Sequence, residues 1–246
     1  ASLPSDRNPP LMTDKTPLAL LPGLLCNDAL WQPQVEHLSD IAAPWVADFT
    51  SQDSIAAMAE SVLAAMPERF ALAALSMGGY VALEIMATAP ERVERLALLD
   101  TRPATDGEDE RKRRRGLIEL AQKGQFKGVT PRLLPLFIHQ ARLDDAALSG
   151  TVMAMAEQVG KQAFIRQQQA ILGRRDQTAT LVTIRVPTLV LCGRQDVLTP
   201  LADHQFMAAG IAGARLVVIE DCGHLSTLER PAEVNAALRA WLQTQA

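Results

Sequence analysis

A serine stands between an apolar run and a pair of glycines in the segment ALSMGGYVALE. The apolar residues 70–75 predict a buried strand and residues 78–88 a helix, so the chain has to bend tightly at Ser76. Small residues beside such a bend let the backbone pass closely, and the side chain at the apex is pushed outward. Ala74, Ser76 and Gly78 fit the small-x-nucleophile-x-small pattern of a nucleophile elbow, with alanine where glycine is usual. The segment therefore predicts an accessible hydroxyl at the N-terminus of a helix.

A serine hydroxyl is a weak nucleophile until a base removes its proton, so the elbow needs a histidine and an acid as partners. Asp196 lies just past the apolar strand predicted at 188–192, and His224 lies in the loop after the strand predicted at 214–219. Parallel strands that end at one edge of a sheet would bring both side chains to the serine. Asp100 also ends a predicted strand and could reach the same cleft, so two carboxylates compete to hold the histidine.

Short apolar runs alternate with helix-like segments in the first 100 residues and again from residue 186 onwards. Strands are predicted at 17–21, 45–49, 70–75, 93–100, 188–192 and 214–219, and helices at 31–38, 54–66, 78–88, 201–208 and 232–242. Continuously apolar strands between helices predict a mostly parallel, doubly wound sheet that helices cover on both faces. At 246 residues, of which 48% are hydrophobic, the chain is long enough for one sizeable α/β domain with a modest insertion.

The alternation stops between Thr101 and Arg185, where the sequence is helical and charged. The insertion begins with DGEDERKRRR, whose opposite charges four residues apart favour a solvated helix start over an anion-binding patch. These pairs are Glu108 with Lys112, Asp109 with Arg113, and Glu110 with Arg114. Long insertions in compact domains tend to be functional. This one begins at the end of the strand predicted at 93–100 and ends before the strand predicted at 188–192, so it can cover the ends of the strands. We therefore expect residues 102–185 to form a helical lid over the strand ends, called the cap below.

The apolar residues of the cap have two equally favoured interpretations, an acyl-binding pocket or packing of the cap onto the core. They are Leu133, Leu134, Leu136, Phe137, Ile138, Met153 and Met155. Histidines other than His224 are weaker candidates for the base. His37 and His204 fall on predicted surface helices and His139 in the cap, so each is expected to be solvated or to serve packing.

Five segments in this order resemble the α/β-hydrolase superfamily, and more specifically its compact, cap-bearing serine esterases. They are LLPGLLCNDALW, ALSMGGYVALE, PERVERLALLD, PTLVLCGRQDVLTP and IEDCGHLSTLERPAEV. The resemblance implies a core from residues 17–101 and 186–246, with the cap at 102–185 and a flexible arm at 1–16. The family also has an N-terminal hairpin, which the short arm leaves shortened or absent.

By this resemblance Ser76 is the nucleophile, His224 the general base and acid, and Asp196 the carboxylate that orients the imidazole. Asp100 is then a hydrogen-bonding residue at the base of the cap. The family's oxyanion hole, built from two backbone N–H groups, maps to Leu24 and Met77. Family members often have His-Gly where this chain has Pro-Gly before Leu24, so the wall of that loop differs.

The resemblance implies a carboxylesterase for small to medium acyl chains that needs no metal or organic cofactor. A lactonase, thioesterase, C–C hydrolase, acyltransferase or perhydrolase would use the same triad. Serine at the nucleophile position argues against haloalkane dehalogenases and epoxide hydrolases, which use a carboxylate. An alternative function outside the enzymes is that of a non-catalytic protein, which retains the hydrolase fold and binds a small ligand as a receptor.

Composition excludes other classes of partner. A formal net charge of −4 does not suit a domain that gathers phosphate backbones, so no nucleic acid is expected. No apolar stretch approaches the roughly 18 residues of a membrane span, and ASLPSDRNPPLMTDK lacks the apolar centre of a signal peptide.

We expect a cytoplasmic protein whose cysteines, Cys26, Cys192 and Cys222, are reduced and packed without a metal. A homodimer is compatible with the sequence, which does not distinguish an apolar cap face from a dimer interface.

Overall fold

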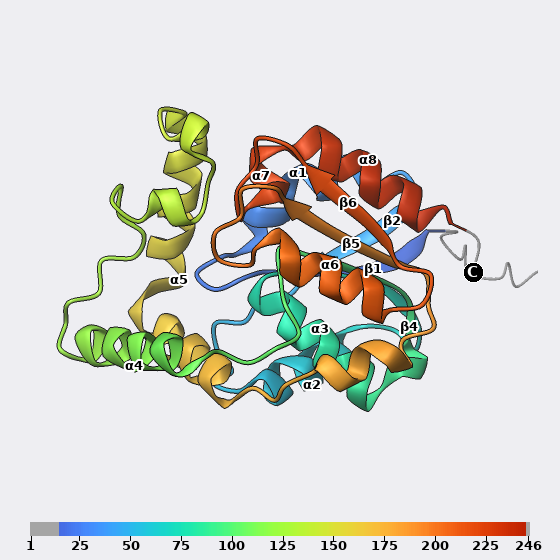
Figure 1. Cartoon of the computed structure of the whole chain (residues 1–246), viewed down its shortest axis with the longest axis horizontal. Helices are drawn as coiled ribbons and strands as arrows, with labels where there is room; N and C mark the ends of the chain where they lie inside the picture. Colours follow the sequence, from blue (N-terminus) through green and yellow to red (C-terminus); the bar gives the residue numbers. More distant parts are fainter. Residues whose placement is uncertain (1–14, 245–246) are drawn as a thin grey trace, which may run out of the picture.

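The computed structural model describes residues 15–244 and contains one sheet of six parallel strands (Figure 1). The strand order is β2-β1-β3-β4-β5-β6, and each neighbouring pair is parallel. The strands are β1 (Thr16–Leu21), β2 (Ala42–Val46), β3 (Phe70–Leu75), β4 (Val93–Leu99), β5 (Thr188–Gly193) and β6 (Arg215–Ile219). The expected mostly parallel sheet is thus parallel throughout the described chain, and its interior strands β3 and β5 are buried along their whole length.

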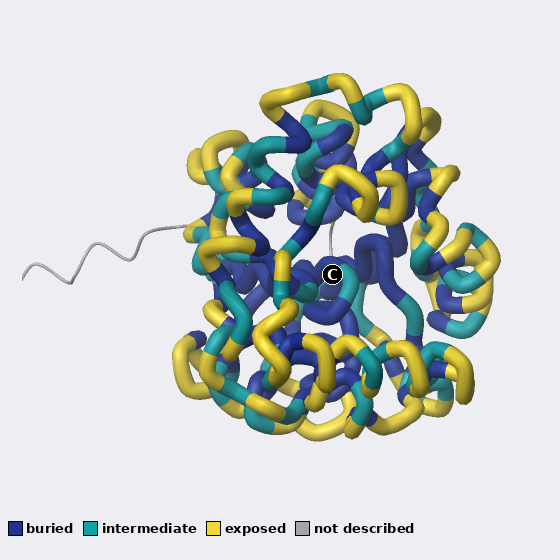
Figure 2. The backbone as a smooth tube through the Cα atoms, turned by 90° about the vertical axis from the view of Figure 1, so that its left-hand side faces the viewer, coloured by how far each residue is buried: buried dark blue, intermediate teal, exposed yellow. Residues whose placement is uncertain are grey.

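Helices cover both faces of the sheet because successive strand residues point to opposite sides. The helices around the sheet are α1 (Gln32–Leu38), α2 (Ile55–Ala65), α3 (Met77–Thr88), α6 (Leu201–Gly210), α7 (Ser226–Glu229) and α8 (Pro231–Leu242). Leu18 and Leu20 pack in a cluster with apolar residues of α1 and α8, whereas Ala19 and Leu21 pack with those of α2, α3 and α6. Figure 2 shows the resulting buried backbone inside a shell of intermediate and exposed segments.

The second strand differs from its prediction. We predicted residues 45–49, and β2 spans Ala42–Val46. The strand includes Pro44, which has no N–H to donate and therefore argues against a strand at this point in the sequence. Since β2 lies at the edge of the sheet and pairs with β1 alone, one side of its backbone needs no strand partner, and the proline is tolerated.

The N-terminal predictions fall largely on residues that the structure does not describe. The expected arm at 1–16 lies outside the described residues except for its last two positions. The prediction of a shortened or absent N-terminal hairpin likewise concerns residues before β1 that lie outside the described range. Within residues 15–244 no helix is long and apolar enough to cross a membrane.

The insertion between β4 and β5 consists of helices and loops that lie beside one end of the sheet (Figure 1). Its long helices are α4 (Glu108–Gln122) and α5 (Ala146–Gly173), with short 3-10 turns at Leu134–Leu136, Gln140–Arg142 and Thr178–Thr183. Other 3-10 turns, at Asp28–Trp31 and Pro90–Arg92, belong to the core. Helix α5 is interrupted at Gly160, where φ is 79° and ψ is 174°. Glycine adopts this left-handed φ without the clash that a Cβ would cause.

The charged run at the start of α4 does not form the predicted pairs along the helix. Arg114 instead binds the buried Asp106 at 2.6 Å, and Glu110 binds Arg102 at 2.9 Å. Arg174, from the end of the cap, also contacts Asp106 at 2.9 Å. Burial would raise the pKa of Asp106, but these arginines outweigh it and hold that pKa far below its ordinary range. The side of the helix start that contains Arg114 is therefore paired with the buried Asp106 and is not fully solvated. The solvated start that we expected describes the exposed residues of the run.

Candidate active site

Ser76 occupies the bend between β3 and α3 in a strained conformation. Its φ of 54° and ψ of −117° are uncommon for a residue with a side chain, and such strain costs on the order of 1–3 kcal/mol. A Cβ on Gly78 would lie 2.4 Å from the carbonyl oxygen of Leu21, so only glycine fits beside the neighbouring strand. Ala74 is fully buried in β3, and the predicted elbow forms with alanine at this position.

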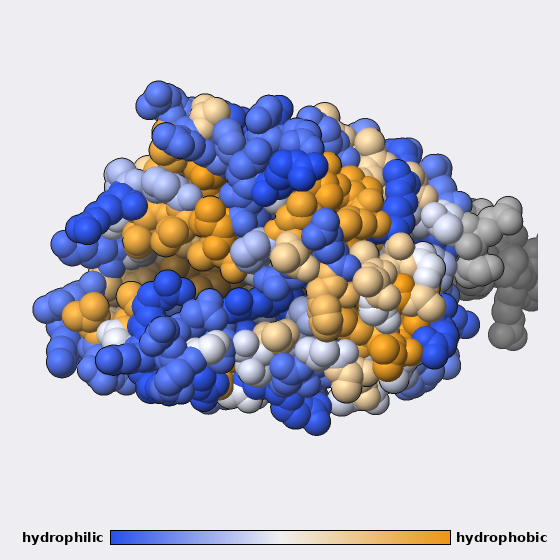
Figure 3. Space-filling view, viewed as in Figure 1, coloured by the Kyte–Doolittle hydropathy of each residue, from blue (hydrophilic) through white to orange (hydrophobic). Residues whose placement is uncertain are grey.

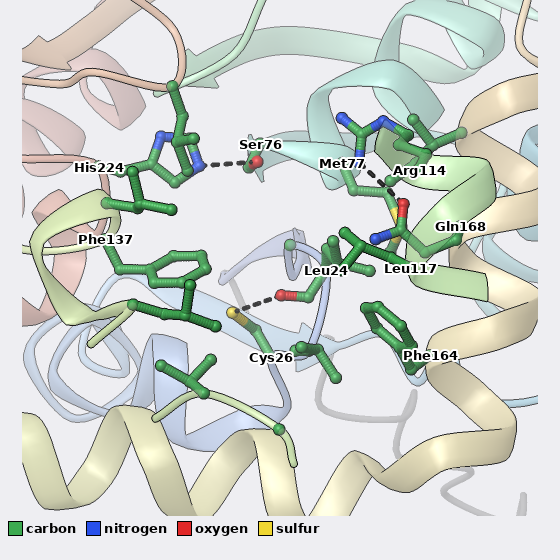
Figure 4. Close-up of a pocket in the computed structure, with 18 of the residues that line it drawn as sticks. Leu24, Cys26, Ser76, Met77, Arg114, Leu117, Phe137, Phe164, Gln168 and His224 are labelled. Carbon is green, nitrogen blue, oxygen red and sulfur yellow. Dashed lines mark hydrogen bonds between the residues drawn. The ribbon is translucent and has the colours of Figure 1, made fainter. Parts of the chain in front are cut away.

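The imidazole of His224 joins the serine to Asp196. Nε2 of His224 lies 2.9 Å from Oγ of Ser76 (Figure 4), and Nδ1 lies 2.8 Å from Oδ2 of Asp196. His224 follows β6 and Asp196 follows β5, so the ends of parallel strands bring together residues that are far apart in the chain. Because the carboxylate can only accept, Nδ1 carries the hydrogen and Nε2 is free to accept the serine proton. The structure thus brings the three predicted residues into one hydrogen-bonded chain.

The buried acid and base stabilise each other's charged forms. Burial alone would lower the pKa of His224, but the charge and hydrogen bond of Asp196 outweigh it and raise that pKa above 6.5. Burial likewise opposes ionisation of Asp196, yet His224 and Thr199 hold its pKa below the ordinary value. The Thr199 hydroxyl donates to Oδ2 of Asp196 at 2.6 Å, and its N–H donates to Oδ1 at 3.0 Å. Asp196 is therefore fixed as an ionised partner for the imidazole.

Asp100 holds the backbone around the triad rather than the imidazole. Its Oδ1 accepts the N–H of Gly193 at 3.1 Å, and its Oδ2 accepts the hydroxyl of Ser226 at 2.5 Å. Ser226 lies two residues after His224, so this carboxylate ties the end of β5 to the start of α7. Burial and the nearby charge of Asp196 raise the pKa of Asp100 well above its ordinary value.

The remaining histidines have hydrogen-bond partners other than Ser76. Of the two roles expected for His204, solvated or packing, the structure shows packing, because the ring lies on the buried side of α6. Its Nε2 accepts the N–H of Thr101 at 3.0 Å, so Nδ1, 3.2 Å from the carbonyl oxygen of Pro200, carries the hydrogen. Burial lowers the pKa of His204 to about 4, which keeps the ring neutral in this packing role. His37 is exposed, and His139 caps a short turn in the cap by accepting the N–H of Ala141.

Two backbone segments flank the serine where the oxyanion hole was expected. Met77 is the first residue of α3, and the N–H groups in the first turn of a helix have no carbonyl partner within it. Leu24 lies in the loop after β1, which passes so close to the elbow that a Cβ on Gly23 would lie 3.2 Å from Cβ of Ser76. Both Leu24 and Met77 line the same cavity as Ser76 (Figure 4).

That cavity, of about 720 Å³, extends from the triad between the core and the cap. Figure 3 shows a hollow with apolar side chains on the side of the molecule where the cap lies. The apolar cap residues divide between the two predicted roles. Leu133, Leu136 and Phe137 line the cavity, whereas Leu134, Ile138 and Met155 are buried in the packing and Met153 lies partly buried against it. Cations also lie along the cavity, at Arg102, Arg113, Arg114, Lys127 and Arg132.

Sequence reasoning missed two buried side chains near the site, Gln167 and Glu229. Gln167, on α5, bonds the loop that contains Leu24. Glu229, on α7, accepts the N–H of Gly223 at 3.0 Å and that of His139 at 2.8 Å, so it joins the His224 loop to the cap. Gln167 belongs to no local motif, and no signal in the sequence separates it from other polar residues on helices. Glu229 lies in the segment IEDCGHLSTLERPAEV, in which the resemblance assigned a role to His224 alone.

The cysteines are free and buried, as expected. Burial raises the pKa of Cys26 and of Cys192 to about 12, so these thiols stay protonated at neutral pH and are poor nucleophiles. Across residues 15–244 no group of three histidine, cysteine, aspartate or glutamate side chains is arranged to hold a metal ion.

A family model described as alpha/beta hydrolase family matches residues 11–237. The chain belongs to the alpha/beta hydrolase family. Among curated relatives of this alpha/beta hydrolase is a pimeloyl-[acyl-carrier protein] methyl ester esterase of Nitrosomonas europaea. The two are 26% identical over 243 residues, which cover 87% of this chain and 90% of the relative.

Solved structures agree with the family assignment. A thermophilic esterase from Thermogutta terrifontis superimposes on this alpha/beta hydrolase with a TM-score of 0.82 at 26% identity, covering 93% of this chain and 89% of the esterase. The enol-lactonase from Burkholderia xenovorans LB400 has a TM-score of 0.85 at 22% identity, covering 94% and 92%. The second likeness shows the fold alone. The predicted resemblance to esterase-like alpha/beta hydrolases is confirmed.

Proposed function

We propose that this protein is a serine carboxylesterase that acts on small to medium acyl chains. The observation that carries the proposal is the continuous chain from Ser76 through His224 to Asp196, with distances of 2.9 and 2.8 Å, at the wall of a largely apolar cavity. The esterases among the curated relatives and solved structures support the reaction class. A non-catalytic receptor would not need a serine held in a strained turn against a neutral imidazole nitrogen.

The chemistry proceeds in two halves. Nε2 of His224 accepts the proton of Ser76 while Oγ attacks the ester carbonyl, and the N–H groups of Leu24 and Met77 stabilise the oxyanion that develops. His224 then donates this proton to the departing alcohol, which leaves an acyl group on Ser76. Water attacks the acyl-enzyme with His224 again as base, and the released serine recovers its proton. Asp196 stays ionised and stabilises the imidazolium that forms in each half.

The cavity supports a substrate of limited size. Its volume of about 720 Å³ falls within the range of small-molecule pockets. Leu133, Leu136 and Phe137 offer an apolar wall for an acyl chain on the cap side. An acyl chain much longer than this wall would have to extend into solvent, so we expect the rate to pass through a maximum with chain length.

The test is the rate of p-nitrophenyl ester hydrolysis across acyl lengths from acetate to palmitate. We expect a maximum at short or medium chains and loss of turnover in Ser76→Ala. Ser61→Ala, on α2 with its hydroxyl bonded to Met58, is the matched control and should keep the wild-type rate. Turnover that survives in Ser76→Ala would refute the assignment. A lactone and an acyl thioester in the same panel compare the other reactions open to this triad.

A further inference from the structure

The loop after β1 contains a backbone conformation that its sequence does not favour. The N–H of Cys26 donates to the carbonyl oxygen of Gly23 at 3.1 Å and closes a four-residue turn. Leu25, the third residue of that turn, has φ of 59°. Glycine or asparagine usually occupies such a position, because a larger side chain crowds the backbone when φ is positive. Contacts from outside the turn must therefore hold Leu25 in place.

The peptide group between Leu24 and Leu25 is held at both of its polar atoms. Its N–H, on Leu25, donates to Oε1 of Gln167 at 3.0 Å. Its carbonyl oxygen, on Leu24, accepts from the thiol of Cys26 at 3.4 Å, and Figure 4 shows this second bond. Burial raises the pKa of the Cys26 thiol to about 12, so it remains a donor at neutral pH. A peptide group fixed at both ends cannot rotate without losing a buried hydrogen bond.

Gln167 is itself fixed by the core. The side chain is 1% exposed, and its Nε2 donates to the carbonyl oxygen of Phe49 at 3.1 Å, which leaves Oε1 to face Leu25. Gln167 lies on α5, beyond the break at Gly160, and so reaches from the cap to two loops of the core. It lies outside the residues that line the cavity, whereas its neighbour Gln168 is among them. Contact with substrate is thus not its role.

We propose that Gln167 is a positioning residue of the oxyanion hole, which holds the Leu24–Leu25 peptide so that the adjoining N–H of Leu24 faces the reacting carbonyl. The inference rests on the proposed function, because it needs Leu24 as an oxyanion donor. Charge on the carbonyl oxygen develops only in the transition state, so a misplaced donor lowers kcat and leaves KM nearly unchanged. The cap helix α5 then contributes to catalysis through the backbone of the core.

Gln167→Met tests this inference, since it keeps the side chain near its original volume and removes both hydrogen bonds. Arg166→Met is the matched control. Arg166 precedes Gln167 on α5 and donates to the carbonyl oxygen of Thr50 at 2.9 Å, so this variant also loses a bond between cap and core but leaves the loop untouched. We expect kcat to fall roughly 10- to 100-fold in Gln167→Met, with KM within about two-fold of wild type. Arg166→Met should retain both constants.

A second measurement reports the oxyanion hole directly. A trifluoromethyl ketone forms a tetrahedral adduct with Ser76, and we expect Gln167→Met to weaken its affinity by the same factor as kcat. A merely structural role would leave that affinity unchanged in the protein that remains folded. An effect confined to KM, or an equal loss in both variants, would overturn the inference while the proposed function stands.

Labelling of Ser76 by a fluorophosphonate separates the inference from the proposed function, because it requires the nucleophile and oxyanion hole but no ester turnover. Labelling that is about ten-fold slower in Gln167→Met than in Arg166→Met supports the inference even if every ester proves inert. Equal labelling rates in the two variants contradict it. A wild-type Ser76 that fails to react at all would overturn both proposals.

Discussion

Asp100 and Asp196 follow neighbouring strands of the sheet, and their carboxylates hold different partners. Asp196 lies 2.8 Å from Nδ1 of His224, whereas Asp100 accepts hydrogen bonds from Gly193 and Ser226. The two acids were rivals for one role in the sequence, and the geometry separates them. Asp196 can stabilise a charged imidazole by direct contact, whereas Asp100 acts on the imidazole through the backbone that it holds.

Amide substitutions distinguish these two acids. Asp196→Asn would lower kcat by about 10⁴-fold, because an amide facing Nδ1 favours the wrong tautomer of His224 and carries no charge to stabilise the imidazolium. Asp100→Asn retains an oxygen that can accept the N–H of Gly193, so its loss should stay below roughly ten-fold. Steady-state kinetics of both variants, with circular dichroism to verify folding, provide the comparison. A larger loss in Asp100→Asn would reverse the assignment.

The pH dependence of kcat/KM should reflect the raised pKa of His224. Protonated His224 cannot accept the serine proton, so activity falls as pH decreases, with a midpoint above the ordinary histidine value of 6.5. Initial rates measured from pH 5 to 9 test this statement. A wild-type midpoint below 6.5 would contradict the stabilisation of the charged imidazole by Asp196.

Glycine at the elbow is required for packing, whereas glycine in α4 is not. Gly78→Ala would place a Cβ 2.4 Å from the backbone of Leu21, and overpacking of this kind costs about 1–3 kcal/mol. Gly116 lies within α4, and a Cβ there meets nothing within 4 Å. Gly116→Ala should therefore stabilise the fold by roughly 0.5–1 kcal/mol. Chemical denaturation measures the free energy of unfolding, which should fall in Gly78→Ala and rise in Gly116→Ala. Equal changes in the two variants would show that residue 78 and the backbone of Leu21 can move apart at little cost.

The cations along the cavity should favour esters that carry a second, anionic group. Within residues 15–244, Arg113, Lys127 and Arg132 line the cavity without forming an ion pair. Exposed pairs contribute about 0.2–1 kcal/mol each, so a carboxylate on the acyl chain should lower KM several-fold against a neutral isostere. High salt should remove this preference by screening the charges.

Replacing all three cations by glutamine should abolish the preference for anionic esters and leave the neutral ester unaffected. Arg215→Gln, an exposed change on β6 away from the cavity, is the matched control. KM values for the two esters, measured at low and at high salt, are the readout. A preference that persists in the triple variant would place anion recognition elsewhere.

Much of the fold follows from local patterns. The apolar run of β3 coincides with its prediction, and α2 lies within the helix predicted at 54–66. Where local signals conflict, prediction fails. The strand at Ala42–Val46 contains a proline that only an edge position tolerates, and the bounds predicted for it, 45–49, were displaced. This error concerns the surroundings of a residue rather than its own preference.

The sequence by itself determined the alternation of strands and helices, the tight bend at Ser76, and the presence of an acid and a histidine after later strands. These features are encoded within a few residues, because hydrophobic periodicity distinguishes helices from strands and glycine permits a tight turn. Local patterns left Asp100 and Asp196 as rivals, the family resemblance favoured Asp196, and only the tertiary structure shows the contact of Asp196 with His224. It also decided which apolar cap residues face the cavity. It alone revealed the bond from Gln167 to Leu25, which joins residues 142 positions apart. Such contacts arise from the packing of the cap on the core, and packing at this range has no signature in local sequence.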